Sequence, residues 1–323
     1  MPIIKVDNIS KSYGDFQALK DISFEVEEGE VFGFLGPNGA GKTTTINILC
    51  TLIRPTSGKA SVAGYDLIKN MNQVRRSIGL VFQETTLDDY LTAEQNILFH
   101  ALAYGVKADL RRHRTKELLT LMELWDRRKD KIRTYSGGMK RRLEIVRGLV
   151  HLPKILFLDE PTLGLDPQTR NRIWEYILDL REKQGLTIFL TTHYMDEAEH
   201  SDRIAVIDHG EIVALDTPDT LKTEVSGDLV TITSDNNDLV ENELHEKYSL
   251  QAESRNGILS VRVQKGEEFI VKFVQGFNGK LLSIGLRRPT LEDVFLNVTG
   301  REIRDEKVDE HALIRQGMRG RFH

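Results

Sequence analysis

The sequence predicts an α/β protein with a parallel sheet and a phosphate-binding loop, followed by a small α+β domain. A glycine-rich loop at residues 36–43 lies between an apolar run and a helical pattern. Two further apolar runs, residues 155–158 and 186–192, lead into polar or charged residues, as buried parallel strands often do. In the last third of the chain, strand and helix patterns alternate over residues 229–299. Together these observations favour a large sheet domain that binds phosphate, with a second domain appended.

The loop at residues 36–43 matches G-x-x-x-x-G-K-[ST], a pattern whose backbone amides bind nucleotide phosphates. Residues 30–35 before it predict a buried strand, and residues 44–52 after it predict a helix that stops before Pro55. Unpaired amides and the helix dipole converge at such a helix start and attract an anion. The expected nucleotide contacts are Gly36, Pro37, Asn38, Gly39, Ala40, Gly41, Lys42, Thr43 and Thr44.

Two side chains of this loop have expected roles. Lys42 supplies a positive charge for the β- and γ-phosphates, and the Thr43 hydroxyl is placed to ligate Mg²⁺. The alternative, a chance glycine-rich turn, does not account for the strand before the loop and the helix after it. We therefore expect the chain to bind a nucleoside triphosphate.

Size and composition restrict the class of protein. A length of 323 residues accommodates two domains, or one large domain with an appendage. Hydrophobic residues make up 40% and charged residues 29%, which is ordinary for a soluble globular protein. No apolar run reaches the roughly eighteen residues of a membrane span, and the N-terminus lacks a secretion signal pattern. The single cysteine, Cys50, is expected in the core, and a net charge of −5 argues against nucleic acid as a partner. We expect a cytoplasmic location.

The first 83 residues predict mainly strands. Alternating apolar residues within residues 1–35 indicate two strands joined by a turn at Gly14. Tyr13 lies just before that turn, where it either packs across the strands or stacks on a base. A buried strand at residues 78–82 leads to Gln83, which on the residues alone is an ordinary polar group at a strand end.

Residues 92–150 predict helices. Thr92 and Gln95 form a capping box at the start of the first one. A second amphipathic helix is expected at about residues 110–124. The basic run at residues 111–114 within it is interpreted as a solvated face and not as a nucleic-acid site.

A second anion-receiving helix start follows. Ser136 is a favourable N-cap, and Gly137 and Gly138 after it leave the first amides of the helix accessible. The helix is expected to continue to about Val150. The chain thus has two separate helix starts that could bind phosphate.

Acidic residues follow the strand at residues 155–158. Asp159 and Glu160 lie at its carboxyl end, which is where open α/β sheets bind their ligands. Asp159 is therefore well placed for Mg²⁺, and Glu160 for orienting or deprotonating a water molecule. A turn containing Asp166 and a helix at residues 168–183 come next.

The strand at residues 186–192 ends at His193. A histidine at the edge of a core strand is often structural. Here it is expected at the same sheet edge as Asp159 and Gly36, which favours a functional role.

Taken together, these motifs resemble the nucleotide-binding subunit of an ATP-binding cassette (ABC) transporter, over residues 1 to about 222. Residues 36–43 match the Walker A loop, residues 155–159 match Walker B, and Ser136, Gly137 and Gly138 match the family signature. The remaining matches are Tyr13 to the aromatic A-loop, Gln83 to the Q-loop, Asp166 to the D-loop and His193 to the switch histidine. The resemblance implies a RecA-like core with an antiparallel β subdomain and a helical subdomain.

The resemblance also implies a mechanism. Two ATP molecules with Mg²⁺ would be held between two cassettes of a head-to-tail homodimer, with Ser136–Gly138 of one copy facing the Walker residues of the other. Thr43 and Asp159 would hold the metal, and Gln83 would contribute to the metal or water shell. Glu160 would act as general base or water orienter, and His193 would hold the γ-phosphate. Hydrolysis would drive a separate membrane permease, so the subunit would be peripheral on the inner face of the cell membrane.

The signature departs from the usual Leu-Ser-Gly-Gly-Gln of the family. This chain has Tyr135 and Met139 at its two ends. The serine and the glycines that bind phosphate are present, so only a polar contact from the missing glutamine is in question.

The last third narrows the subfamily. Residues 229–300 predict a small α+β domain with helices on one sheet face, in an accessory or regulatory role. Its segment at residues 288–296 resembles the C-terminal extension of daunorubicin-resistance-type exporter ATPases, which belong to the type-two ABC export systems. Leu291, Val294, Phe295 and Val298 form an apolar stripe that must be buried, and part of it is expected to pack on the cassette or on the other protomer. Residues 301–323 are expected to be a disordered, charged tail.

Two other functions are compatible with such motifs. One is a soluble, non-transport ABC ATPase, although the translation and repair types carry a second cassette or long coiled coils that are not found here. The other is a nucleotide-dependent regulatory switch without sustained turnover. Glu160 argues against the switch.

Overall fold

The computed structural model describes residues 2–225, 227–255 and 257–300. The chain forms two compact units, which divide between Val213 and Ala214, within the edge strand β10 (Glu211–Asp216). This division falls nine residues before the end of the cassette expected from the sequence, at residue 222. The tail expected at residues 301–323 lies outside the described residues. No helix within the described ranges is long and apolar enough to cross a bilayer.

The first unit is built on a six-stranded sheet with the strand order β10-β9-β3-β8-β7-β6. Strand β3 pairs in parallel with β8 and β9, and β7 pairs in parallel with β8 and β6. The strands are β3 (Val31–Leu35), β6 (Ile78–Val81), β7 (Ile155–Asp159), β8 (Thr187–Thr192), β9 (Arg203–Asp208) and β10 (Glu211–Asp216). The sequence had not indicated β9 and β10.

A second, antiparallel sheet has the order β2-β1-β4-β5. Its strands are β1 (Ile4–Tyr13), β2 (Phe16–Val26), β4 (Ser57–Val62) and β5 (Tyr65–Asp66). Phe24 of β2 stacks on Phe32 of β3, with ring centroids 5.4 Å apart, and Phe189 of β8 joins the same cluster. This aromatic cluster binds the antiparallel sheet to one face of the parallel sheet.

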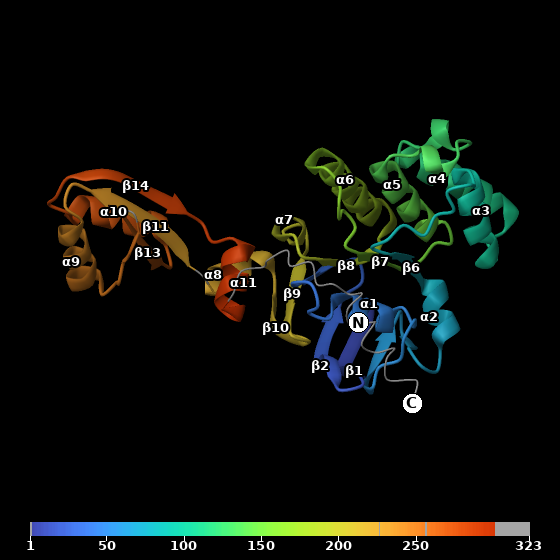
Figure 1. The fold of residues 1–323 in the computed structure, drawn as a ribbon, viewed down its shortest axis with the longest axis horizontal. Coiled ribbons are helices and arrows are strands. Elements are labelled where there is room, and N and C mark those ends of the chain that lie inside the picture. Colours follow the sequence, from blue (N-terminus) through green and yellow to red (C-terminus); the bar gives the residue numbers. More distant parts are fainter. Residues whose placement is uncertain (1, 226, 256, 301–323) are drawn as a thin grey trace, which may run out of the picture. The chain divides into compact units, whose positions relative to one another are not determined.

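Helices cover the other face of the parallel sheet. In Figure 1, α1 and the β1–β2 pair lie on one side of β6–β8, and α4, α5 and α6 lie on the other. The helices of this unit are α1 (Lys42–Leu49), α2 (Met71–Ser77), α3 (Ala93–Ala103), α4 (Ala108–Leu121), α5 (Gly137–Leu149), α6 (Pro167–Gln184) and α7 (Met195–Ala198). The capping box expected at Thr92 is present. Helix α1 ends at Leu49 and not at residue 52, since Thr51 has a positive φ of 60°.

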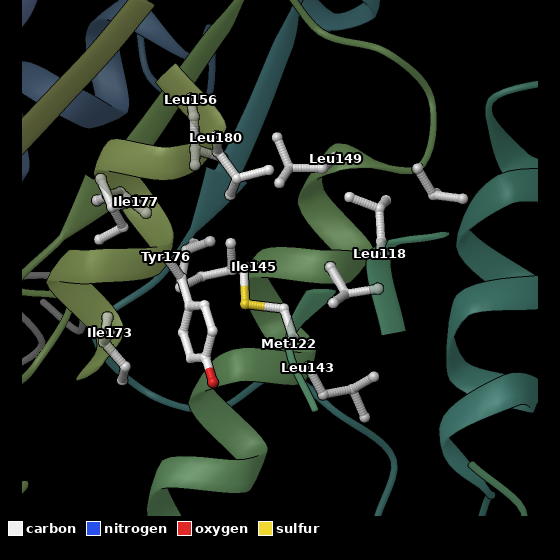
Figure 2. Close-up of a cluster of buried hydrophobic side chains, with 14 of the residues drawn as sticks. Leu118, Met122, Leu143, Ile145, Leu149, Leu156, Ile173, Tyr176, Ile177 and Leu180 are labelled. Atoms are coloured by element: carbon white, nitrogen blue, oxygen red, sulfur yellow. The ribbon is translucent and has the colours of Figure 1, made fainter. Parts of the chain in front are cut away.

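The largest core of this unit lies between β7 and the helices. Figure 2 shows Leu156 of β7 among apolar side chains of α5 and α6, with Leu118 of α4 and Met122 beside them. All five residues of β7 are buried, and adjacent side chains of a strand face opposite sides of its sheet. Leu156 and Leu158 therefore belong to the helical core, while Phe157 contacts Phe189 in the aromatic cluster.

The basic run at residues 111–114 is not entirely a solvated face, as the sequence had suggested. Arg112 and His113 are exposed, but Arg114 is buried. Its guanidinium donates to the carbonyl of Leu149 and to the side-chain oxygen of Gln184. The interpretation was wrong for Arg114 because these acceptors lie 35 and 70 residues further along the chain.

The second unit has its own antiparallel sheet with the order β12-β13-β11-β14. Its elements are α8 (Pro218–Val225), β11 (Asp228–Ser234), α9 (Asn237–Tyr248), β12 (Glu253–Arg255), β13 (Ile258–Val263), α10 (Gly266–Gly276), β14 (Leu281–Arg287) and α11 (Leu291–Thr299). Val230 and Ile232 of β11 are fully buried with Val240 and Leu244 of α9 and Phe273 of α10. Both helices thus contribute to a single core on the sheet.

The apolar stripe of α11 is buried within this chain. Leu291, Val294 and Phe295 are each at most 1% exposed, and Val298 is half-buried. Helix α11 packs on α8, which belongs to the same unit. The stripe therefore helps to complete the second unit, and its three buried side chains are not available to another protomer.

Replacing Phe295 tests this packing. Phe295→Ala should destabilise the second unit by about 3–5 kcal/mol, because it leaves a cavity in a filled core. Leu296→Ala is the matched control, since the neighbouring side chain is 38% exposed and should cost less than about 1 kcal/mol. Hydrogen exchange of the full-length chain locates the loss at the amides of α11. Equal protection in the two variants would contradict the assignment.

The contacts of the Asp293 carboxylate predict that the stability of the second unit depends on pH. It accepts hydrogen bonds of 2.9 Å from Arg287 and from Thr290. Burial alone would raise the pKa of Asp293, but these partners outweigh it and lower the pKa to about 2.

Because the folded-state pKa is below the usual value near 3.8, the stabilisation is present above that pH and lost as the pH falls towards 2. Asp293→Asn should therefore lower the free energy of unfolding by about 2 kcal/mol at pH 7. This difference in stability from the wild type should shrink as the pH falls from 4 to 2. Urea unfolding of the wild type and the variant at several pH values measures this difference. A difference that stays constant over this range would show that the carboxylate charge is not involved.

Candidate active site

The parallel sheet brings the predicted site residues to one edge. Strands β3, β8, β7 and β6 are neighbours and run in the same direction, so their carboxyl ends lie side by side. The loop at residues 36–43 follows β3, and His193 follows β8. Asp159 is the last residue of β7 and Glu160 comes directly after it, while Gln83 follows β6. This is the edge at which open α/β sheets bind ligands.

The phosphate loop, residues 36–43, passes close to neighbouring backbone. A Cβ atom on Gly36 would lie 2.3 Å from the Ile207 carbonyl oxygen. Gly41 has a φ of 109°, and a Cβ there would lie 2.9 Å from the Ala18 carbonyl oxygen. Both positions therefore need glycine. Asn38 and Gly39 are exposed, so the loop has an outward side that a ligand can reach.

Three side chains form a buried charged group behind the loop. Lys42 Nζ lies 3.2 Å from Glu160 Oε1, and His193 Nδ1 lies 3.2 Å from Glu160 Oε2. These side chains are only 5–7% exposed. Lys42 Nζ also donates to the carbonyl oxygens of Gly36 and Pro37, at 2.8 and 3.1 Å. The Glu160 carboxylate is thus held between the lysine of one loop and the histidine of another.

Burial and charge act against each other in this group. Burial lowers the pKa of Lys42, and the neighbouring carboxylates of Glu160 and Asp159 oppose that shift. For Glu160, burial would raise the pKa, but His193 and Lys42 outweigh it and lower the pKa. Glu160 is therefore held ionised, which suits a proton acceptor.

Asp159 belongs to a second cluster beside the first. Its Oδ1 accepts from the Thr191 hydroxyl at 2.5 Å and from the Thr43 hydroxyl at 3.4 Å. Burial raises the pKa of Asp159, and these two hydroxyls oppose the shift. A carboxylate and a threonine hydroxyl that both face a phosphate loop are oxygen ligands of the kind that Mg²⁺ prefers.

The other predicted residues are not joined to this cluster by any hydrogen bond or ion pair seen in the described residues. Gln83 is exposed beyond the end of β6. Ser136 caps α5 by accepting from the Met139 amide at 3.3 Å, and both Ser136 and Gly137 are exposed. Asp166 caps α6 by accepting from the amide and the hydroxyl of Thr169.

Tyr13 lies at the end of β1, opposite Phe16 of β2. Its ring is 50% exposed, and the Phe16 ring is 60% exposed. Lys11 Nζ lies 5.0 Å from the centre of the Tyr13 ring. Much of the Tyr13 ring is therefore accessible to a ligand.

Met139, which stands where the signature usually has glutamine, packs against the helical core of the first unit. Gly138 is also tightly placed, because a Cβ there would lie 2.5 Å from the Thr169 methyl carbon. The start of α5 is thus fixed against the start of α6. The backbone amides of the signature have a defined position without a polar side chain at Met139.

Sequence reasoning missed two residues that shape the site. Thr191 pairs in register with Asp159 across β7 and β8. The strand ends were predicted, but their register was not. Arg141 was not singled out from the sequence, although its helical spacing from Glu144 and Gly148 places it on the inner side of α5.

Comparison with protein families supports a nucleotide site. A family model described as "ABC transporter" matches residues 19–163. This range contains the phosphate loop, Gln83, the start of α5 and both carboxylates of β7.

Two curated relatives match over nearly the whole chain. The chain is 38% identical to the linearmycin resistance ATP-binding protein LnrL of Bacillus subtilis (strain 168), covering 94% of this chain and 100% of the relative. It is also 38% identical to the daunorubicin resistance ATP-binding protein DrrA3 of Streptomyces coeruleorubidus, covering 96% and 98%. Both alignments therefore include the second unit.

Among solved structures, the chain resembles the ATP-binding cassette MJ0796, described as a dimer in a post-hydrolysis state bound to ADP and Pi. The TM-score is 0.60 with 32% sequence identity, over 66% of this chain and 98% of that cassette. The 66% of this chain that aligns corresponds closely to the length of the first unit.

Proposed function

This chain belongs to the ABC transporter family and is one of its ATP-hydrolysing subunits, and we propose that Glu160 is the general base of that hydrolysis. The observation that carries the proposal is the Glu160 carboxylate, 3.2 Å from both Lys42 Nζ and His193 Nδ1 at the end of β7. A buried carboxylate beside a phosphate-loop lysine is suitably placed to act on a water that attacks the γ-phosphate.

The residues present fit Mg²⁺ as the cofactor. Thr43 and Asp159 would hold the ion together with phosphate oxygens, and Gln83 would reach it or its water shell from the end of β6. Thr191 orients the Asp159 carboxylate by its hydrogen bond. When bound, the ion would neutralise charge on the β- and γ-phosphates.

The chain's own residues account for the remaining steps. Backbone amides of the phosphate loop and of the start of α1 hold the phosphates, and the Lys42 ammonium offsets their negative charge. Glu160 accepts a proton from water as the water oxygen bonds to the γ-phosphorus and the bond to the bridging oxygen of ADP breaks. His193, which lies against Glu160, contacts the γ-phosphoryl group. Tyr13 stacks on the adenine ring.

A second copy of the chain would complete each site. Ser136, Gly137 and Gly138 present an exposed helix start that no described contact joins to the phosphate loop. The dimeric state of the similar cassette supports a head-to-tail homodimer, in which this helix start and Asp166 face the partner's nucleotide.

The dimer would drive export through a separate membrane permease. The subunit would be attached to the inner face of the cell membrane through that permease. A drug-like cargo is supported by the names of the two relatives, which are called linearmycin resistance and daunorubicin resistance ATP-binding proteins. Alignment of these relatives over nearly the full chain supports the daunorubicin-resistance type, including the second unit as its accessory domain.

Glu160→Gln tests the general base. ATP binding should be retained, because the amide keeps the shape of the side chain, while turnover falls by about a hundredfold or more. The variant should also accumulate as an ATP-dependent dimer in size exclusion. Glu175→Gln is the control, because this exposed glutamate lies on α6 and pairs only with the nearby Arg172 in the described contacts. If Glu160→Gln lost ATP binding as much as turnover, the assignment would be wrong.

Tyr13→Ala tests base stacking. It should weaken ATP binding by about 1–3 kcal/mol, while Tyr13→Phe should change it little because the ring remains. Tyr65→Ala provides the control, since Tyr65 is another exposed aromatic residue in the same antiparallel sheet. Equilibrium binding of ATP to the full-length chain measures the change. An alanine variant that is destabilised but binds ATP normally would favour the packing role.

A further inference from the structure

One buried guanidinium, that of Arg141, binds the backbone of the site from behind. Arg141 lies in the second turn of α5 and is only 6% exposed, although it stands between two other cations in the sequence. Its Nη2 atom donates to the carbonyl oxygens of Asp159 and Glu160, at 3.0 and 2.9 Å. Its other donors reach the carbonyl oxygens of Pro161 and Phe82. The guanidinium thus contacts four backbone carbonyls from two strand ends.

The charge of Arg141 is balanced within α5. Glu144, one turn further, lies 3.2 Å from Arg141 Nη1 and is itself buried. The same carboxylate accepts from the Thr86 amide at 2.8 Å, which also holds the segment after β6. Arg141 is therefore fully occupied by protein groups, and it points at the backbone of the catalytic segment and not at a ligand position.

The backbone of that segment has an unusual conformation. Glu160 has a φ of 45°, a left-handed conformation that carries a steric cost for any residue other than glycine. Successive carbonyls of an extended strand point to opposite sides, so three in a row cannot reach one planar group from a regular strand. The turn at Glu160 brings the carbonyls of residues 159–161 together on the guanidinium. From the other side, the Glu160 amide donates to the carbonyl and the hydroxyl of Thr191.

We infer that Arg141 is a positioning residue for hydrolysis, which holds the Glu160 backbone in its left-handed conformation and so keeps the carboxylate between Lys42 and His193. The inference rests on the proposed role of Glu160 as the base. It also joins three parts of the site, because Arg141 lies on the helix that starts with the signature and contacts the residue before Gln83. Arg141 itself touches none of the reacting atoms.

Arg141→Lys in the full-length chain is the first test. Lysine keeps the positive charge, but its compact ammonium cannot match the planar fork that spans four carbonyls. We expect kcat to fall about ten- to a hundredfold through a misplaced Glu160, with ATP affinity unchanged. Arg142→Lys is the matched control: Arg142 lies on the same helix and also donates to a backbone carbonyl, that of Met122, away from the strand ends. Loss of ATP affinity in parallel with kcat would overturn the inference.

A double-mutant cycle separates positioning from general support of the fold. If Arg141 acts through the Glu160 carboxylate, Arg141→Lys should reduce the residual turnover of Glu160→Gln little further. If it supports the fold in general, the two losses should multiply, and that result would also overturn the inference. Wild-type turnover by Glu160→Gln alone would instead overturn the proposed function, so the two failures are distinguishable.

Glu144→Gln is a second variant that tests the same inference if Arg141→Lys does not fold. It removes the charge that balances the guanidinium and leaves Arg141 in place. We expect the same pattern with a smaller loss, in which kcat falls several-fold while ATP affinity is unchanged. Full kcat in a folded Glu144→Gln variant would count against the positioning role.

Discussion

The site depends on a buried pair of opposite charges, the Lys42 ammonium and the Glu160 carboxylate. Removing either charge from water alone costs several kcal/mol, so each group requires the other at close range. The two lie 118 positions apart in the sequence, one at the start of α1 and one at the end of β7. Only the parallel register of β3, β8 and β7 brings them together. Apolar packing on both faces of the sheet stabilises this register.

The two faces of the sheet support the site in different ways. On one face, rings of β2, β3, β7 and β8 pack against one another in stacked and tilted pairs at centroid distances of 5.4–6.0 Å, which fixes how neighbouring strands lie. On the other face, α5 and α6 cover β7 with aliphatic side chains, and Arg141 reaches through this layer to the strand ends. The Arg141 guanidinium is tolerated in this layer because every partner it meets is a carbonyl or a carboxylate.

Local patterns predicted much of this site, and tertiary contacts account for what they missed. The phosphate loop, the acidic end of β7 and the histidine after β8 follow from short motifs and from the rule that parallel strands share an edge. Thr191 and Arg141 could not be assigned in the same way, since their partners depend on register and on how α5 crosses the sheet. Arg114 was misjudged for the same reason, because the acceptors on Leu149 and Gln184 are distant in the sequence. The strands β9 and β10 had no strong motif to mark them.

One chain carries two helix starts that are predicted to bind phosphate, and no contact seen in the described residues joins them. The start of α1 faces Glu160, whereas the start of α5 is exposed and is held in place by Thr169 and by the core beneath Met139. In the proposed dimer, the start of α5 would sense the nucleotide of the partner. Arg141 lies one turn further along that helix and holds the backbone of Glu160. A shift of α5 caused by the partner's nucleotide would therefore act directly on the proposed base of this chain's own site, which would be a physical route for coupling the two hydrolysis events.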